Sequence, residues 1–361
     1  MGIICYIYRM RKIFIGVLVI AILYFGYRYF TKNIVPNKKT KNIPLTESAF
    51  IPPTAGPPTS PRLRGTSQRG KEKKSIFVPD WSLTDDTIID NSYDRWIYFG
   101  EQEKMSQFTQ NLKGKELWYT EKVNTVNELT SLRVNEFEAN NFKGVVLDLE
   151  ISELPTEKLK DEINTGVYEF YKAAKQEKLQ VALALYGDLF YRVRPYDLSV
   201  LKDYCDEVMV MAYDFHKSRG EPGPNFPYNG RDIYGYDFKM MVDDYLKYIP
   251  PEKLTVVFGM YGYDWLVDEQ KKPIKPAQAV TLKEIKKNFI NKCSWNNCVI
   301  KRDSVSAERE IDYIYSVIKN SEGYMDMHII WSEDERSVAT KSAYLKEKGI
   351  GSVGYWAYGY F

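Results

Sequence analysis

The chain has 361 residues, of which 44% are hydrophobic and 15% aromatic, so it can bury one large core or two ordinary ones. The formal net charge of +2 is unevenly distributed, because residues 1–30 carry +4, residues 31–74 carry +8 and residues 75–361 carry −10. A basic stalk therefore precedes an acidic body. This distribution argues against a nucleic-acid partner for the body.

The first apolar segment is a run of fifteen uncharged residues between Lys12 and Arg28. It is short for a membrane-spanning helix and long for the core of a cleaved signal peptide. Five bulky aromatic residues near its end suit a membrane interface better than a cleavage site: Tyr24, Phe25, Tyr27, Tyr29 and Phe30. We therefore interpret 13–30 as a transmembrane signal anchor after a short cytoplasmic segment, 1–12. Basic residues on both flanks leave its orientation open by charge alone.

Residues 31–74 mix Pro, Ser, Thr, Lys and Arg without apolar periodicity, which is typical of a flexible linker. From residue 75 to 361, short apolar runs alternate with amphipathic segments, as in successive β-α units. Eight such units predict an α/β fold of the (β/α)8 TIM barrel type. The expected strands lie near 76–79, 96–99, 116–119, 145–150, 181–186, 208–213, 254–261 and 352–357.

Two helices are visible from their apolar period. Residues at helical spacing share one face between strands four and five: Leu159, Ile163, Val167, Phe170 and Ala174. A second helix is expected over 336–348, with Gly349 directly after its end. The interval from Tyr263 to Asp334 is too long for one helix. It predicts a small inserted subdomain, approximately 266–332, between strands seven and eight.

Cysteines and histidines are few, with four and two in the chain. Cys293 and Cys298 could close a small disulfide loop if the body faces an oxidising space. A zinc site would need two more soft ligands nearby, and the sequence places none there. Cys205, beside an apolar strand, is typical of a buried thiol. No metal or cofactor is predicted.

The clearest chemical signal is the acid pair Asp148 and Glu150 at the end of an apolar strand. Side chains alternate along a strand, so the two carboxyl groups are expected on the same side. Neighbouring carboxylates do not both ionise easily, which favours one of them as a proton donor near neutral pH. On its own, however, such a pair is usually an ordinary solvated strand end.

Further acids and aromatic residues follow the other predicted strands. In a barrel, the reactive residues lie at these carboxyl ends. Aromatic faces stack on sugar rings and carboxylates bind sugar hydroxyls, so the set indicates a carbohydrate site. Its members are Asp80, Trp81, Tyr213, Asp214, Tyr261, Tyr263, Asp264, Trp265, Tyr355 and Trp356. Tyr261 could equally pack beneath loops, and Trp81 could be structural.

These motifs resemble glycoside hydrolase family 18, the chitinase-like family. Its signature DGxDxDxE aligns with residues 143–150, its MxYD with Met211-Ala212-Tyr213-Asp214, and its strand-eight tryptophan with Trp356. The likeness covers roughly residues 75–361 in order and spacing. It is greatest to the bacterial branch that includes spore-cortex N-acetylglucosaminidases.

The resemblance implies a substrate-assisted retaining mechanism, an exception to the usual scheme with two carboxylates. Glu150 would protonate the glycosidic oxygen, and Asp148 would stabilise the oxazolinium formed by the substrate's acetamido group. Tyr213 would bind that acetamido group, and Asp214 and Trp356 would contact the same sugar. Tyr261 and Trp81 are further candidates for binding the substrate.

Two replacements depart from the family signature. Lys143 stands for its first Asp, and Val146 stands for its middle Asp, which shares a proton with the third. We therefore expect reduced or shifted activity. The expected substrate is a β-1,4-linked N-acetylglucosamine polymer, peptidoglycan rather than chitin. The chain is expected to act as a monomer on the outer side of the cell membrane. The alternative is a weakly catalytic lectin, which Glu150 disfavours and Val146 leaves open.

Overall fold

The computed structural model describes residues 72–84, 90–319 and 322–361. The expected cytoplasmic segment, 1–12, and transmembrane anchor, 13–30, lie outside these residues, as does the expected linker up to residue 71. Within the described ranges, no helix is both long enough and apolar enough to cross a membrane. The last expected linker residues, Lys73 and Lys74, are the first two residues of strand β1.

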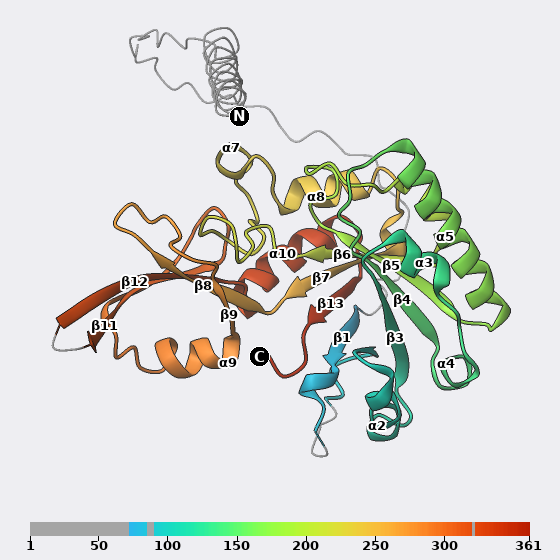
Figure 1. Ribbon diagram of the computed structural model, residues 1–361, viewed down its shortest axis with the longest axis horizontal. Coiled ribbons are helices and arrows are strands. Elements are labelled where there is room, and N and C mark those ends of the chain that lie inside the picture. Colours follow the sequence, from blue (N-terminus) through green and yellow to red (C-terminus); the bar gives the residue numbers. More distant parts are fainter. Residues whose placement is uncertain (1–71, 85–89, 320–321) are drawn as a thin grey trace, which may run out of the picture. The chain divides into compact units, whose positions relative to one another are not determined.

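Eight parallel strands close a barrel in the order β1-β13-β7-β6-β5-β4-β3-β2, which confirms the predicted TIM barrel (Figure 1). Each expected strand is present, and the largest difference is at β3, which continues four residues beyond Tyr119. The barrel strands are β1 (Lys73–Pro79), β2 (Arg95–Phe99), β3 (Glu116–Val123), β4 (Gly144–Leu149), β5 (Gln180–Tyr186), β6 (Glu207–Ala212), β7 (Leu254–Gly259) and β13 (Ser352–Trp356).

The two helices expected from their period are present. Helix α5 (Glu157–Gln176) buries the predicted apolar face, and the Thr156 hydroxyl caps it by accepting from the Leu159 N–H. Helix α10 (Glu335–Glu347) ends just before Gly349, which has a left-handed φ of 81°. The other α-helices in the described part of the chain are short: α2 (Met105–Asn111), α3 (Val126–Ser131), α4 (Glu136–Asn141), α6 (Leu198–Leu201), α7 (Arg231–Tyr234), α8 (Phe238–Tyr245) and α9 (Leu282–Ile285).

The barrel interior is a packed apolar layer rather than a channel. Alternate strand residues point inward, and those in the middle of the barrel are almost all apolar: Phe77, Ile97, Trp118, Val146, Ala182, Ala184, Met209 and Val257. At the N-terminal end the buried Arg95 guanidinium lies 2.9 Å from the Glu207 carboxylate. Val146 therefore adds an apolar side chain where the family signature has an acid.

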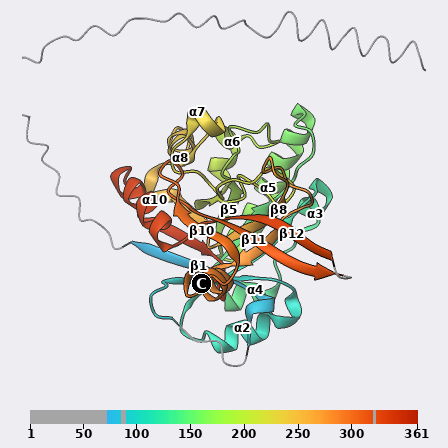
Figure 2. The same cartoon turned by 90° about the vertical axis from the view of Figure 1, so that its left-hand side faces the viewer.

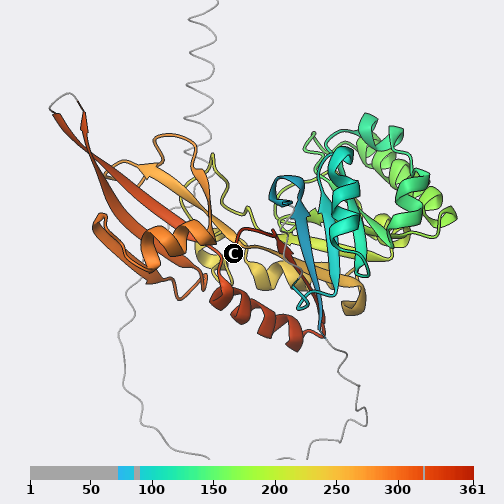
Figure 3. The ribbon, with the colours of Figure 1, turned by 90° about the horizontal axis from the view of Figure 1, so that it is seen from below.

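A five-stranded antiparallel sheet, order β10-β11-β12-β8-β9, is inserted between β7 and α10. Figures 1 and 3 show it to one side of the barrel, and Figure 2 views it from that side. It begins at Tyr261, earlier than expected, because only Met260 separates β7 from β8. Its strands are β8 (Tyr261–Val267), β9 (Gln278–Thr281), β10 (Asn296–Arg302), β11 (Arg309–Lys319) and β12 (Glu322–Ser332).

The three cysteines within the described ranges take two different states. Cys293 and Cys298 form a disulfide in the insertion, next to the start of β10. Cys205 is a free, buried thiol, and burial raises its pKa to about 12. The interpretation of Cys205 as a packing residue is confirmed, since a thiol with so high a pKa is a poor nucleophile.

Candidate active site

The two acids of the sequence motif lie side by side at the C-terminal end of β4. Asp148 is in the strand and only 6% exposed, while the Glu150 side chain is 32% exposed. The Glu150 N–H donates to the carbonyl oxygen of Val123 at 2.8 Å, so pairing with β3 continues through Glu150. The alternation of a strand therefore applies to both residues, as the sequence predicted.

Asp148 lies in surroundings that disfavour its charge. Burial, together with the charge of Glu150, raises its pKa to about 7, and the charge of Lys122 acts in the opposite direction. Its Oδ1 has no hydrogen-bond partner in the described part of the chain. Val146, two residues earlier and on the same side of β4, offers no polar group to share its proton. Asp148 consequently keeps its proton to a higher pH than an ordinary carboxyl group does.

Lys122 is a site residue that sequence reasoning missed. It lies opposite Asp148 in the β3–β4 register, and its Nζ is 3.0 Å from Glu150 Oε2. Its side chain is 40% exposed, so this ion pair is open to solvent. The rule that reactive residues follow barrel strands would have found Lys122 if β3 had been extended past Tyr119.

Tyr213 directly follows β6 and brings a hydroxyl to the acid pair. Burial raises its pKa well above the ordinary value, and the charges of Asp148, Asp214 and Glu150 add to this effect. Its hydroxyl therefore stays protonated and can donate a hydrogen bond. The structure thus brings Glu150, Asp148 and Tyr213 together.

Asp214 is held from several sides. Its backbone is left-handed, with a φ of 59°, and its N–H donates to Asn225 Oδ1 at 2.7 Å. The hydroxyls of Tyr261 and Tyr263 both donate to Asp214 Oδ1, the second at 2.8 Å. Tyr261 is only 7% exposed, so it is a buried hydrogen-bond partner of Asp214 and does not face solvent. Asn225 gave no signal in the sequence.

Aromatic rings gather at the ends of β1, β2 and β13. Trp356 lies with its ring centre 4.8 Å from that of Phe99 and 5.7 Å from that of Phe77. Trp81, 55% exposed, lies edge-on to Trp356 at 6.5 Å. Two expected sugar-binding residues, Trp81 and Trp356, therefore belong to one aromatic group, and Trp81 is its exposed member.

Two cationic side chains lie against the ring of Tyr186, a tyrosine affected by the charge of Glu150. Tyr186 ends β5, and burial together with the charge of Glu150 raises its pKa. The Arg194 guanidinium lies 3.9 Å from the Tyr186 ring centre, and Lys217 Nζ lies 5.3 Å from it. Arg194 pairs with Asp188 at 2.9 Å. Lys217 is exposed and, among the described residues, has no carboxylate within ion-pair distance.

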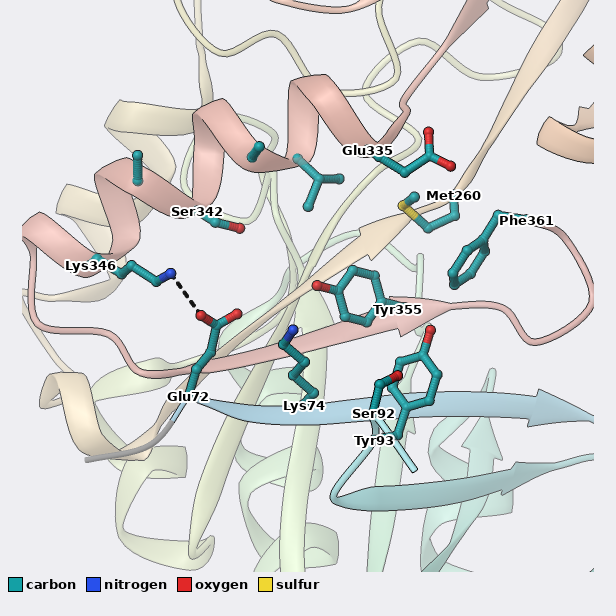
Figure 4. Close-up of a pocket in the computed structure, with 13 residues that line it drawn as sticks. Glu72, Lys74, Ser92, Tyr93, Met260, Glu335, Ser342, Lys346, Tyr355 and Phe361 are labelled. Carbon is teal, nitrogen blue, oxygen red and sulfur yellow. Dashed lines mark ion pairs between the residues drawn. The ribbon is translucent and has the colours of Figure 1, made fainter. Parts of the chain in front are cut away.

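The close-up in Figure 4 shows a pocket of about 470 Å³ that lies elsewhere, between the start of β1 and helix α10. Lys346 and Glu72 form an ion pair of 2.8 Å at its edge, and Tyr93 and Tyr355 line it. None of the acids described above lines this pocket, so it is not the candidate active site. The described ranges contain no cluster of three or more His, Cys, Asp or Glu residues placed to hold a metal ion.

Comparison with known proteins agrees with this geometry. Residues 91–360 match the family described as Glycosyl hydrolases family 18. The chain belongs to this family. The resemblance inferred from the sequence motifs is thus confirmed, and the chain is a glycoside hydrolase by family.

Among curated relatives, a cortical fragment-lytic enzyme of Bacillus anthracis is 26% identical over 167 residues, 45% of this chain and 34% of the relative. A putative sporulation-specific glycosylase of Bacillus subtilis (strain 168) is 24% identical over 164 residues, again 45% and 34%. Di-N-acetylchitobiase of Rattus norvegicus is 25% identical, covering 45% of each chain. The chain therefore spans less than half the length of these relatives.

Solved structures show the same fold. A Group IV chitinase of Ostrinia furnacalis, in complex with allosamidin, has a TM-score of 0.61 at 15% identity and covers 80% of this chain and 92% of its own. A family 18 N-acetylglucosaminidase of Paenibacillus barengoltzii has a TM-score of 0.60 at 14% identity, covering 81% and 96%.

Proposed function

We propose that this protein hydrolyses β-1,4 bonds of polymers that contain N-acetylglucosamine, by a substrate-assisted retaining mechanism. The observation that carries the proposal is the grouping of Glu150, Asp148 and Tyr213 at one end of a family 18 barrel. A partly exposed carboxyl group, a buried one and a protonated hydroxyl supply the three interactions that the reaction needs. Chitinases and a cortical enzyme among the similar proteins support this substrate class.

In the first step Glu150 donates a proton to the glycosidic oxygen as its bond to the anomeric carbon breaks. The substrate's acetamido oxygen attacks that carbon and forms an oxazolinium ion, while the leaving sugar departs with the proton. Asp148 accepts a hydrogen bond from the acetamido N–H, and Tyr213 donates one to the acetamido group. Glu150 then takes a proton from water, which opens the oxazolinium ion with retention.

The ion pair with Lys122 affects the first step. Glu150 must reach the glycosidic oxygen to donate its proton, and Lys122 Nζ lies 3.0 Å from Glu150 Oε2 at the same place. A substrate group that attracts Lys122 would draw this cation away from Glu150. An anionic substrate group close to the scissile bond would attract Lys122 in this way.

We therefore prefer peptidoglycan to chitin as the substrate. Peptidoglycan carries carboxylates, on the lactyl ether where the stem peptide has been removed and on the stem peptide elsewhere, whereas chitin is uncharged. Lys122 pairs with Glu150, and Arg194 and Lys217 lie against the Tyr186 ring, although residues 75–361 have a net charge of −10. A local group of cations on an acidic body favours an anionic substrate. The similarity to a cortical fragment-lytic enzyme is consistent with this choice.

The proposed location rests on the sequence alone. Residues 13–30 would anchor the chain in the cell membrane as a single span, with the catalytic body outside the cytoplasm. The basic linker would hold the body near anionic wall polymer or lipid headgroups.

A second candidate is a carbohydrate-binding protein with weak catalysis, and Val146 favours it. The apolar layer beneath Asp148 removes the carboxyl group with which that residue would share a proton. Such a protein would bind the polymer through Asp214 and its aromatic residues without rapid cleavage.

One experiment separates the two candidates. The full chain, Glu150→Gln and the exposed control Glu153→Gln are each incubated with chitin oligosaccharides and with glycan strands stripped of stem peptides. We expect Glu150→Gln to lower the rate about 10²- to 10⁴-fold, because it removes the proton donor. Glu153→Gln should match the wild type, as its side chain is exposed. If product masses stay at background for all three proteins while sugar still binds, the lectin is the correct function.

A further inference from the structure

Three charged residues are completely buried away from the acid pair. We call Glu308, Glu333 and Lys341 the buried triad, since each has 0% exposure. Lys341 Nζ lies 2.9 Å from Glu308 Oε1 and also bonds to Glu333 Oε2. Glu308 directly precedes β11, Glu333 follows β12, and Lys341 is in α10. The triad thus joins the inserted sheet to a barrel helix.

The charges in the triad are unequal. Burial and the charge of Glu308 raise the pKa of Glu333 to about 8, although Lys341 opposes this. Burial acts to lower the pKa of Lys341, but the charges of Glu308 and Glu333 outweigh it, so this pKa is raised. Lys341 therefore stays charged, and burial favours the protonated form of Glu333.

Glu308 also binds the backbone of a loop that leads to the active site. Its Oε2 accepts the N–H of Asn225 at 2.6 Å, and its Oε1 accepts the N–H of Phe226 at 2.8 Å. With Lys341, three donors satisfy one buried carboxylate. Charge-assisted hydrogen bonds in a dry interior are among the strongest that side chains form.

Asn225 links the Glu308 carboxyl group to Asp214 by hydrogen bonds. Its Oδ1 accepts the N–H of Asp214 at 2.7 Å, and its Nδ2 donates to the carbonyl oxygen of Gly259 at 3.1 Å. Asp214 has a φ of 59°, a left-handed conformation that is uncommon for a residue with a side chain. The hydrogen bond from its N–H to the Asn225 side chain helps to hold it there.

We propose that Glu308, anchored by Lys341, is a positioning residue for Asp214, so that the inserted sheet sets the orientation of a sugar-binding carboxylate. This inference rests on the proposed function, in which Asp214 contacts the sugar. A buried triad that served folding alone would affect stability without a specific effect on Asp214.

The first test compares two variants within the triad. In Glu308→Gln, one side-chain oxygen becomes an NH2 group that cannot accept a hydrogen bond. One of the two hydrogen bonds from the Asn225 and Phe226 N–H groups is therefore lost. Glu333 remains bonded to Lys341 in this variant, so the buried ammonium group still has a carboxyl partner. Glu333→Gln is the matched control, because Glu333 is equally buried but does not contact Asn225 or Phe226.

For Glu308→Gln we expect kcat/KM on chitin oligosaccharides to fall about tenfold, mainly through a higher KM, because substrate binding is impaired. Glu333→Gln should stay within about twofold of the wild type. Combined with Asp214→Asn, Glu308→Gln should add less than about a twofold further loss, because it acts through the residue already changed. Equal losses in the two triad variants, or full additivity with Asp214→Asn, would overturn the proposal.

A second readout does not require activity. Hydrogen exchange of the Asp214 amide in the full chain should be faster in Glu308→Gln than in wild type or Glu333→Gln, since its bond to Asn225 loosens. If the wild type cleaves no polymer, the proposed function fails while this measurement still tests the coupling. Unchanged exchange in a folded Glu308→Gln variant would reject it.

Discussion

Lys122 Nζ lies 3.0 Å from Glu150 Oε2, so the proposed proton donor is paired with a cation from the neighbouring barrel strand. Both side chains are partly exposed, at 40% and 32%, and such pairs add little to the stability of a fold. The pair is therefore of more interest for substrate choice than for folding.

Replacing Lys122 should change selectivity between polymers. In Lys122→Met we expect kcat/KM for glycan strands with free lactyl carboxylates to fall about tenfold, since a charge-assisted contact is lost. The value for uncharged chitin oligosaccharides should fall much less. Lys143→Met, which changes an exposed lysine directly before β4, is the control and should leave the ratio unchanged. A parallel loss on both polymers would show that Lys122 does not select for charge.

Restoring the family acid at position 146 should shift the pH–rate profile. In the wild type, Asp148 ionises around pH 7, so the acid limb is expected near that value. In Val146→Asp two neighbouring carboxyl groups share a proton, and the first ionisation moves down by at least about one pH unit. Val146→Asn, which is similar in shape but does not titrate, is the control. Coincident wild-type and Val146→Asp profiles would contradict this account.

Asp148 should make stability depend on pH. Its pKa is about 7 in the folded chain and about 3.9 when unfolded, so folding favours the neutral form. The protonated Asp148 therefore stabilises the fold fully below about pH 4, and this stabilisation is lost as the pH rises through about 7. Asp148→Asn should remove up to about 4 kcal/mol of that decline, measured by urea unfolding. Glu121 and Glu333 should account for the remaining loss of stability with rising pH, since burial raises their pKa values to about 7 and about 8.

The control for that experiment is Asp161→Asn, an exposed acid on α5. It should leave the pH dependence as in the wild type. If the free energy of unfolding falls with pH as steeply in Asp148→Asn as in the wild type, Asp148 is already ionised at low pH.

Trp81 should contribute to sugar binding and little to folding. It is 55% exposed, so Trp81→Ala removes little buried surface. We expect KM for chitin oligosaccharides to rise about three- to tenfold, the range of one aromatic contact. Tyr168→Ala, an exposed aromatic residue on α5, is the control. Equal KM values for wild type and Trp81→Ala would place the sugar away from this aromatic group.

The sequence predicted the barrel and the acid pair well because both depend on local patterns. Apolar runs mark the buried strands, and Asp148 and Glu150 follow one of them directly. Lys122 was missed because β3 continues through Thr120 and Glu121, which carry no apolar signal. Pairing with β4 extends the strand there, and that contact is not local.

The supports of Asp214 could not be predicted for the same reason. Glu308 and Asn225 are 83 residues apart, and no local pattern links a glutamate before one strand to an asparagine in a distant loop. The start of the inserted sheet was also misplaced. Only Met260 separates β7 from β8, so Tyr261 was expected at the end of the seventh barrel strand.

The loop that carries Asp214 is also bonded directly to the inserted sheet and its connections. Trp265 Nε1 donates to the carbonyl oxygen of Gly220 at 3.0 Å, and the Tyr228 N–H donates to that of Ser306 at 3.0 Å. Asp148 and Glu150, by contrast, belong to the barrel. Gentle warming that loosens the insertion should therefore abolish turnover while the circular dichroism of the barrel is still intact, and cooling should restore it.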